Sequence, residues 1–268
     1  MLLATLLFAG ATRAASPETP VDGAADAAAD ATALDRAWAA WQPTLQAHGR
    51  IPVVLGADEL ATVARGEVAR RREHLDGIDR AVGATWSDLP RDALWIAILD
   101  DTCDQLVDGL TERHLPPELP GQKILFQHVD LPWPLSDRQW IIDIRNNRDL
   151  HAVSGGGAWE RTWTLADRQE ERRGRVPHER LPAPDAIWTP LNEGGWLLVD
   201  AAGGSLVVYH GRADVGGAIP DDLGTRFALA TLRSMLRHVV ERAVQVPAHY
   251  DAMHPPLERP DGTVIPPW

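Results

Sequence analysis

The sequence contains very little cysteine and very little lysine. Cys103 is the only cysteine in 268 residues, which excludes an internal disulfide and a zinc site built from a cysteine cluster. Lys123 is the only lysine among 26 basic residues, so there is no lysine-rich arm. Acidic residues number 38 and give a formal net charge of −12, which argues against an electrostatic grip on nucleic acid or on an anionic membrane. We expect no nucleic-acid partner.

The usual catalytic motifs are absent as well. The sequence has no Gly-x-Gly-x-x-Gly segment before a helix, no phosphate-binding loop and no His-Glu-x-x-His pair. Ser205 lacks the second glycine of a nucleophile elbow. His128 and His210, both in predicted strands, are interpreted as hydrogen-bonded structural residues. We therefore expect no catalytic residue, no metal ion and no cofactor.

The composition is that of a folded chain of one large domain or two small ones. Hydrophobic residues make up 44% and charged residues 24%, which excludes wholesale disorder. The aromatic residues are unevenly distributed, with 11 Trp against 3 Phe and 2 Tyr. Tryptophan brings a large apolar area and one polar N–H, which suits a core or an apolar ligand cavity.

The N-terminus resembles a signal peptide. The apolar run over residues 2–9 is too short to span a bilayer, and small residues follow it, with cleavage expected near Ala14 or Ala15. No lysine or arginine precedes the run, so a misassigned start or an uncleaved amphipathic start is the alternative. We predict a signal peptide over 1–15, a flexible linker over 16–33 and a periplasmic or secreted protein.

The first half of the chain is predicted to contain two helices. Apolar residues at helical spacing predict a helix over 34–47. The segments 53–55 and 63–68 are candidate strands. Ser87 is expected to cap a helix with Pro90 in its first turn. This helix ends in acidic residues that are interpreted as solvated, namely Asp100, Asp101 and Asp104.

The second half is predicted to be a meander of strands followed by one long helix. The candidate strands, each bounded by turn residues, are 122–130, 138–146, 157–165, 185–191, 195–201 and 205–213. A hairpin turn is expected over 201–204, since its glycines tolerate positive φ. The last helix is capped by Asp221 or Asp222, and an irregular tail over 246–268 follows it. The plan is a single α+β domain over 34–245.

The segment from Asp130 to Trp140 is the most specific feature of the sequence. Pro132 and Pro134 enforce an extended corner, Ser136 and Asp137 offer turn hydrogen bonds, and Arg138 begins the next strand. This corner resembles that of the START family of lipid-transfer domains. Three further features agree in order over roughly residues 50–245: the segments 194–196 and 216–220, and the amphipathic last helix.

The resemblance implies a helix-grip fold, in which a curved antiparallel sheet wraps a long C-terminal helix and encloses a tunnel for one apolar ligand. It implies no shared catalytic residues, although the wider superfamily includes aromatase/cyclase enzymes. Several members place an arginine in the tunnel, six residues after the corner arginine, opposite an acid on the preceding strand. Here that position is Ile144, and the segment 124–128 has no carboxylate, so we expect a more apolar tunnel.

Alternation along the strand 138–146 assigns its cavity face. Ile144 and its even-numbered neighbours face inward, and Arg145 faces outward. An ordinary filled core with no cavity is the alternative. The residues predicted to line the ligand site are Trp140, Ile142, Ile144, Trp163, Trp196, Leu229, Leu232, Met235 and Leu236.

The sequence thus favours a monomer that binds a hydrophobic small molecule or lipid and transfers it in transient contact with a membrane. Gly216 and Gly217 are a candidate hinge for gating by the last helix, the alternative being a tight turn. Two other functions stay open. One is a cyclase- or hydrolase-like enzyme using His128, His210 or Arg161, and the other is an interaction module whose groove holds a partner segment.

Overall fold

The computed structural model describes residues 29–50, 53–100, 110–119, 121–131, 135–166, 185–217 and 221–268, without the side chains of 221–224 and 227. The predicted signal segment and almost all of the predicted linker lie outside these residues. So do Cys103, Asp101, Asp104, residues 132–134 of the corner and residues 218–220.

Among the described residues, nine strands form one sheet that is antiparallel except at one pair. The strand order is β1-β2-β9-β8-β6-β5-β4-β3, and β7 pairs in parallel with β5. The strands are β1 Ala69–Leu75, β2 Ile78–Ser87, β3 Leu110–Leu115, β4 Gln122–Val129, β5 Arg138–Asn146, β6 Ala158–Leu165, β7 Ile187–Trp188, β8 Leu191–Ala201 and β9 Gly204–Asp214.

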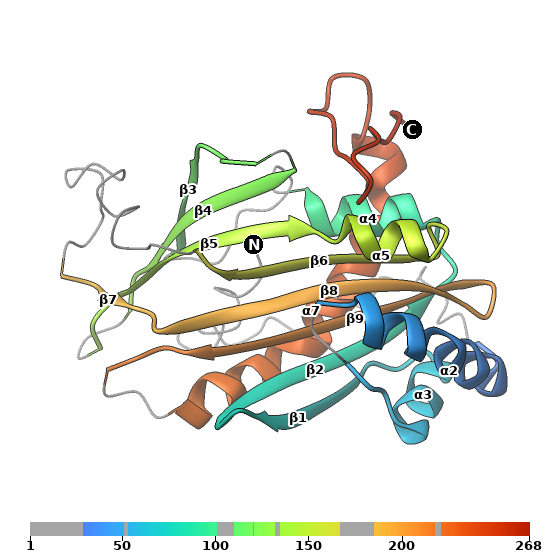
Figure 1. Ribbon diagram of the computed structural model, residues 1–268, viewed down its shortest axis with the longest axis horizontal. Coiled ribbons are helices and arrows are strands. Elements are labelled where there is room, and N and C mark those ends of the chain that lie inside the picture. Colours follow the sequence, from blue (N-terminus) through green and yellow to red (C-terminus); the bar gives the residue numbers. More distant parts are fainter. Residues whose placement is uncertain are drawn as a thin grey trace.

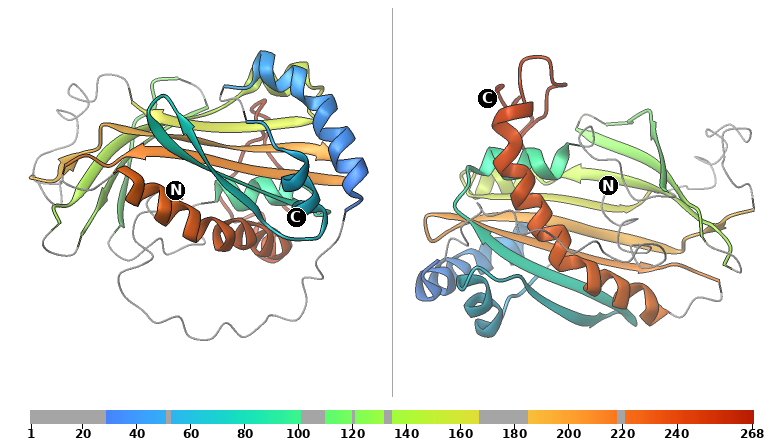
Figure 2. Two further views of the ribbon diagram at one scale, coloured as in Figure 1. Left: turned by 90° about the horizontal axis from the view of Figure 1, so that it is seen from below. Right: turned by 180° about the vertical axis from the view of Figure 1, so that it is seen from behind.

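Helices cover both faces of this sheet (Figures 1 and 2). The described helices are α2 Ala31–His48, α3 Ala57–Ala64, α4 Arg91–Leu99, α5 Arg148–Val153 and α7 Asp221–His249. The long helix α7 crosses one face diagonally and packs on β2 and α4, while α2 and α3 lie on the opposite side (Figure 2). Below, the face against α4 and α7 is called the inner face and the opposite one the outer face.

Strand alternation divides the apolar side chains into separate cores. The inner core joins α4, α7 and residues such as Leu125, Ile142 and Trp196. The outer core joins α2 and α3 to residues such as Val82 and Val208. Because successive strand residues point to opposite faces, one sheet can carry a helix layer on each side.

Local sequence features explain several element boundaries. The side chain of Asp30 accepts hydrogen bonds from the backbone N–H of Thr32 and Ala33 and so caps α2. Ala202 and Gly203 both have positive φ, at 52° and 82°, in the two-residue turn that joins β8 to β9. The predicted hairpin turn is therefore confirmed.

Most of the predicted elements in the second half are confirmed. The strand predicted over 138–146 is β5 with the same bounds, and the strand predicted over 122–130 is β4. The strands predicted over 157–165, 195–201 and 205–213 are β6, β8 and β9, with β8 four residues longer at its start. The segment 185–191 contains the two-residue strand β7 and the first residue of β8 instead of one continuous strand.

In the first half of the chain, several predicted elements differ from the structure. The helix predicted over 34–47 is α2, but the candidate strand at 63–68 is wrong, because Val63 lies in α3. The hairpin β1–β2 and the strand β3 were not predicted. Pro90 is the N-cap of α4 and not part of its first turn, and Ser87 accepts a hydrogen bond from the backbone N–H of Leu89 and none from α4.

Residues 250–268 of the tail are irregular, as predicted, but residues 246–249 belong to α7, and the tail is packed against the inner core. Tyr250 and Ile265 are buried, and the Tyr250 hydroxyl donates to the Ile265 carbonyl oxygen. The indole N–H of Trp95 donates to the Glu258 carbonyl oxygen at 3.0 Å, which ties the tail to α4. Within the described part of the chain, no helix has the length and apolar character needed to cross a membrane.

Candidate functional site

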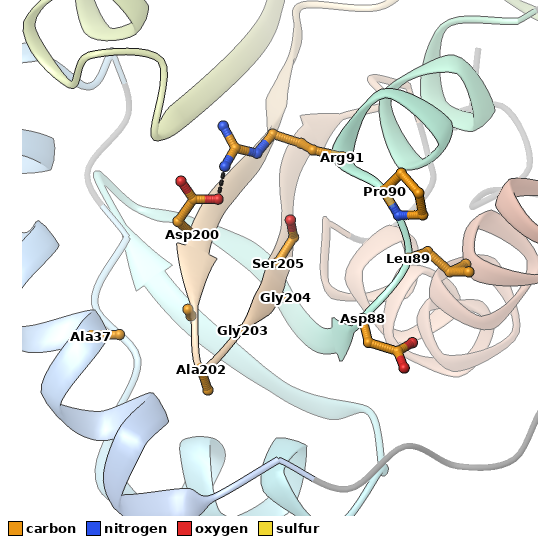
Figure 3. A pocket seen from close by; sticks show the side chains of 11 residues that line it. Ala37, Asp88, Leu89, Pro90, Arg91, Asp200, Ala202, Gly203, Gly204 and Ser205 are labelled. Atoms are coloured by element: carbon orange, nitrogen blue, oxygen red, sulfur yellow. Dashed lines mark ion pairs between the residues drawn. The ribbon is translucent and has the colours of Figure 1, made fainter. Parts of the chain in front are cut away.

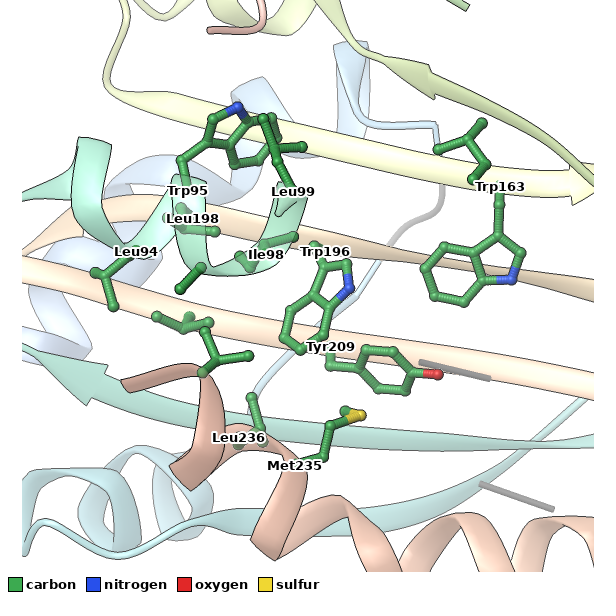
Figure 4. Close-up of a cluster of buried hydrophobic side chains, with 14 of the residues drawn as sticks. Leu94, Trp95, Ile98, Leu99, Trp163, Trp196, Leu198, Tyr209, Met235 and Leu236 are labelled. Atoms are coloured by element: carbon green, nitrogen blue, oxygen red, sulfur yellow. The ribbon is translucent and has the colours of Figure 1, made fainter. Parts of the chain in front are cut away.

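The inner face brings together the residues predicted to line a ligand site. Eight of them are buried members of the inner core, and Leu229 packs against it while partly buried. They come from three strands and from α7, on whose apolar side Met235 and Leu236 face the sheet (Figure 4). Whether they contact a ligand stays a prediction, because close packing of this kind also describes an ordinary core.

Aromatic rings form the centre of this face. The rings of Trp196 and Tyr209 meet edge to face with centroids 4.9 Å apart, and Trp163 lies 5.8 Å from Tyr209 (Figure 4). The indole N–H groups of Trp140 and Trp163 donate to the side-chain oxygens of Gln127 and Asn192. Among the described residues, the buried Tyr209 hydroxyl has no hydrogen-bond partner, and burial raises its pKa.

Glycine at the start of β8 makes room for this aromatic group. A Cβ at Gly194 would overlap the ring of Trp163 and the carbonyl oxygen of His210. The Gly194-Gly195-Trp196 segment of the sequence thus has a steric reason: the backbone of β8 must approach its neighbours closely where the tryptophans pack.

Two basic side chains share this face with the aromatic rings. Lys123 is paired directly across from Ile144, and Arg161 lies between Asn146 and Trp196 on the neighbouring strands. In antiparallel pairs, residues directly opposite each other point to the same side of the sheet. Lys123 and Arg161 therefore face the inner core, on either side of β5.

Burial destabilises the charged forms of Lys123 and Arg161 relative to their neutral forms. Desolvation lowers the pKa of Lys123 to about 7, with a further contribution from the positive charge of Arg161. Desolvation also lowers the pKa of Arg161 to about 10. The Arg161 guanidinium donates a hydrogen bond of 3.0 Å to the side-chain oxygen of Asn146. This acceptor is uncharged.

The expectation of a more apolar surface around Ile144 is therefore not met, because Lys123 and Arg161 lie on the same face. Ile144 does face inward and is buried, but the neighbouring strands β4 and β6 supply the basic groups that β5 lacks. Counting along one strand missed them. The available signals were a lysine directly before the apolar residues Ile124, Leu125 and Phe126, and an arginine two residues from Trp159 and Trp163.

Arg145 lies on the outer face, as predicted. Its guanidinium pairs with Asp143, and both line an outer-face groove of about 390 Å³ together with Arg50 and Glu193. The opposite orientations of Ile144 and Arg145 follow from the alternation of β5.

The two histidines considered as enzymatic groups do not face the inner core. His128 follows Phe126 and Ile124 on the outer side of β4, and His210 follows Val208 on the outer side of β9. Burial and the nearby Arg80 lower the pKa of His210 to about 3, so its imidazole is neutral. The interpretation of His128 as hydrogen-bonded is wrong, because in the described structure neither ring nitrogen has a hydrogen-bond partner.

The corner arginine connects the β4–β5 corner to the segment before α7. Arg138 is buried, and its guanidinium donates to the carbonyl oxygens of Val215 at 2.7 Å and Gly216 at 3.0 Å. Gly216 and Gly217, the candidate hinge, both have positive φ, at 66° and 73°. Arg138 thus fixes the candidate hinge to the sheet, and gating stays a prediction.

The interpretation of Asp100 as a solvated helix end is wrong. Asp100 is buried beneath the C-terminal part of α7, where its carboxylate lies 3.5 Å from Arg242. His249 and His254 each place Nε2 3.4 Å from a carboxylate oxygen of Asp100. The carboxylate is buried because α4 ends under α7, which no local pattern in α4 indicates.

A second hollow lies at the end of the sheet, where the β8–β9 turn meets the start of α4 (Figure 3). Its volume is about 460 Å³, and its walls come from residues 88–91 and 200–205 with Ala37 of α2. Arg91 spans it, pairing with Asp200 and lying 5.1 Å from the Trp159 ring centroid. This ion pair stabilises the turn against α4.

The sheet wrapped around α7, with α4 beside it, defines a helix-grip α+β fold of the START type. This fold occurs in the structure of human STARD10, which is 12% identical, with a TM-score of 0.54 over 75% of this chain and 84% of that one. It also occurs in human StAR-related lipid transfer protein 5, which is 12% identical, with a TM-score of 0.50 over 80% of this chain and 97% of that one. The predicted fold class is confirmed.

A bacterial structure is similar as well. The STAR-related lipid transfer protein of Xanthomonas axonopodis is 18% identical, with a TM-score of 0.49 over 66% of this chain and 94% of that one. Comparison with protein-family models and with curated proteins gave no match. At these identities the likeness concerns the fold alone.

Proposed function

We propose that the chain binds a hydrophobic ligand that carries one anionic or strongly accepting polar group, between the inner face of the sheet and α7. The observation that carries this proposal is the placement of Arg161, directly across from Trp196 within the aromatic surface. Apolar surface favours the ligand body by about 25 cal/mol per Å² buried, and a buried cation orients a polar end.

Two further points support an acceptor group on the ligand. Asn146 occupies one N–H of the Arg161 guanidinium, which has five in all. A bound carboxylate or phosphate would offset part of the desolvation that lowers the pKa of Arg161 and Lys123. Both groups would then take part in one polar end of the site.

A lipid is the proposed class of ligand. The similar human protein is named as a lipid transfer protein, and its fold is that of this chain. A long acyl or polycyclic body would match the row of tryptophans and the α7 residues Met235 and Leu236. Transfer between membranes, as distinct from storage, is a further proposal that a vesicle-to-vesicle assay would address.

Paired ligands test the proposal. A fluorescent fatty acid and its methyl ester have the same apolar body, but only the acid offers an anion to Arg161. We expect the full chain, freed of co-purified lipid, to bind the acid more tightly than the ester. Arg161→Gln should weaken binding of the acid by about 10- to 100-fold and change binding of the ester much less, because hydrogen bonds to charged groups are worth about 1.5–3 kcal/mol.

Arg145→Gln is the matched control, since it removes an arginine from the outer face of the adjacent strand. It should leave binding of both probes unchanged. Equal affinity for acid and ester that is also insensitive to Arg161→Gln would reject the polar anchor. Failure of the folded chain to bind any hydrophobic probe would reject ligand binding altogether.

A further inference from the structure

A group of polar side chains lies at the corner between β4 and β5, away from the inner core. His128 stands near the end of β4, Asp130 follows that strand, and Asp137 directly precedes β5. One nitrogen of the histidine and one oxygen of each carboxylate lie within 4.8 Å of one another. We propose that His128, Asp130 and Asp137 bind one divalent transition-metal ion of the zinc class.

His128 supplies the independent observation that these residues form a ligand site. Its side chain has no solvent exposure, and within the described ranges neither ring nitrogen makes a hydrogen bond. The ring nevertheless points at both carboxylates, with Nε2 3.3 Å from Asp137 Oδ2 and Nδ1 3.5 Å from Asp130 Oδ1. Buried polar atoms in native structures almost always have a partner, and a bound ion would supply one.

The spacing suits neighbouring ligands of one ion. Two ligand atoms held about 2.0–2.2 Å from a tetrahedral zinc ion are about 3.3–3.6 Å apart. The distance between His128 Nε2 and Asp137 Oδ2 is 3.3 Å, which matches this separation without rearrangement. Asp130 is largely exposed and can turn its carboxylate toward the ion, and a water molecule would complete the coordination.

The surrounding backbone holds two of the ligands in place. The backbone N–H of Leu131 donates to Asp137 Oδ1 at 2.9 Å, which leaves Oδ2 directed at the histidine. His128 is paired with Thr111 of β3 and Gln139 of β5, so the sheet fixes the origin of its side chain. Hydrogen bonds of this kind orient metal ligands and raise affinity.

The donor set indicates the class of ion. Two carboxylates and a neutral imidazole carry a charge of about −2, which a divalent cation neutralises. An imidazole nitrogen favours zinc and its neighbours over magnesium and calcium, which prefer oxygen ligands throughout. We therefore expect Zn²⁺ to bind and Mg²⁺ to bind far more weakly.

At this location a bound ion would also affect the stability of the β4–β5 corner. Asp137 adjoins Arg138, whose guanidinium holds the carbonyl oxygens of Val215 and Gly216 before α7. An ion that ties Asp137 to β4 would stiffen the corner from which Arg138 reaches that segment. Zinc should therefore raise the melting temperature of the whole chain.

Calorimetric titration of the full chain, first treated with a chelator, tests the site. We expect one Zn²⁺ per chain, and we expect Asp137→Asn to weaken binding by at least about 10- to 100-fold, which is the cost already seen when an outer partner of a metal ligand is lost. Asp137→Asn retains the oxygen that accepts from Leu131, so the corner keeps its backbone hydrogen bond. Cobalt bound to the wild type should give a visible absorption band that His128→Gln abolishes.

Asp149→Asn provides the control, because Asp149 forms an exposed pair with His48 at 2.7 Å. It should leave zinc binding, the cobalt band and the rise in melting temperature unchanged. The proposal fails if the wild type shows no saturable binding. It also fails if folded Asp137→Asn and His128→Gln variants both retain wild-type affinity, which would place any bound zinc elsewhere.

Discussion

At the scale of single residues, the inner face combines apolar packing with basic groups that the fold places there from different strands. Lys123 and Arg161 lie on either side of the strand that carries Ile144. Both carry lowered pKa values because burial removes water from their charged forms. The energetic consequence is that an additional positive charge at this point should be poorly tolerated.

Ile144→Arg tests that consequence. The new guanidinium would be buried between two existing cations, and we expect it to lower the free energy of unfolding by about 3 kcal/mol or more. Arg145→Ile, one residue away on the outer face, should cost about 1 kcal/mol, since Asp143 keeps its hydrogen bond from Gln122. Denaturant unfolding of both variants gives the comparison. The reverse order of damage would mean that β5 presents its other side to α7.

The pH dependence of Lys123 gives a second test. Its pKa is about 7 in the folded chain and near its usual value of 10.5 when unfolded, so the unfolded state binds more protons between those values. The lysine therefore destabilises the fold fully below pH 7, and this penalty disappears as the pH rises toward 10.5. Relative to Lys123→Met, the wild type should gain stability over that window, as thermal melts at pH 6 and pH 9 would show. A difference that does not change with pH would contradict the burial.

At the scale of elements, sequence patterns predicted the strands of the meander and the last helix because their apolar periodicity is long and their turns are marked. The hairpin β1–β2 was missed because β1 carries Arg70, Arg71 and Arg72, whose side chains find their partners only in the folded structure. Arg71, for example, pairs with Glu59 of α3. The burial of Asp100 depends likewise on α7, which is distant in sequence.

The segment before α7 combines two features, of which the sequence indicated only one. Two adjacent glycines indicated freedom, but the structure adds a steric requirement: a Cβ at Gly217 would lie 2.8 Å from Ile187 Cδ1 and 3.1 Å from Arg138. Positive φ at Gly217 adds backbone strain for any other residue. Replacing both hinge glycines by alanine would therefore change stability as well as mobility.

A single-site comparison separates these effects. Gly217→Ala should lower the free energy of unfolding by about 2 kcal/mol, because strain and steric overlap add. Gly77→Ala is the control, since Gly77 also has positive φ but has nothing within 4 Å of its new Cβ. It should cost only about 1 kcal/mol. Equal costs in chemical denaturation would show that the contacts of residue 217 are not tight.

At the scale of the whole molecule, the fold was predictable from the order of its motifs, whereas the contents of the site were not. Three features follow one another along the chain in the order typical of the helix-grip fold. They are the β4–β5 corner, the glycine pair before Trp196 and the long last helix. The basic groups near Ile144 come from β4 and β6, so only the pairing of strands reveals that they are neighbours.

Export is a prediction about the whole chain that rests on its first fifteen residues. An apolar run followed by small residues predicts cleavage near Ala14 or Ala15. Intact-mass analysis of protein from its native host should therefore give a mature chain that begins after one of these residues. A mass that includes Met1 would contradict export by this route.

The tail over 246–268 was predicted to lie outside the domain, and its contacts lead to the opposite expectation for a truncated chain. A chain ending at His249 would lose the buried side chains of Tyr250 and Ile265 and the acceptor of the Trp95 indole N–H. Burial of a large apolar side chain is worth about 1.5–3 kcal/mol, so we expect a loss of at least about 3 kcal/mol. The melting temperature should fall by about 6–12 °C, as calorimetry would measure.

A shorter truncation serves as its control. Removing only residues 266–268 leaves Ile265 and the hydrogen bond from Tyr250 to its carbonyl oxygen in place. The backbone hydrogen bond from Trp268 to Tyr250 is lost, so this variant should melt within about 3 °C of the full chain. If both truncated chains have the melting temperature of the full chain, the tail covers the core without contributing to its stability. If the longer truncation alone is destabilised, the folded domain extends to the C-terminal segment, and the tail helps to hold α4 beneath α7.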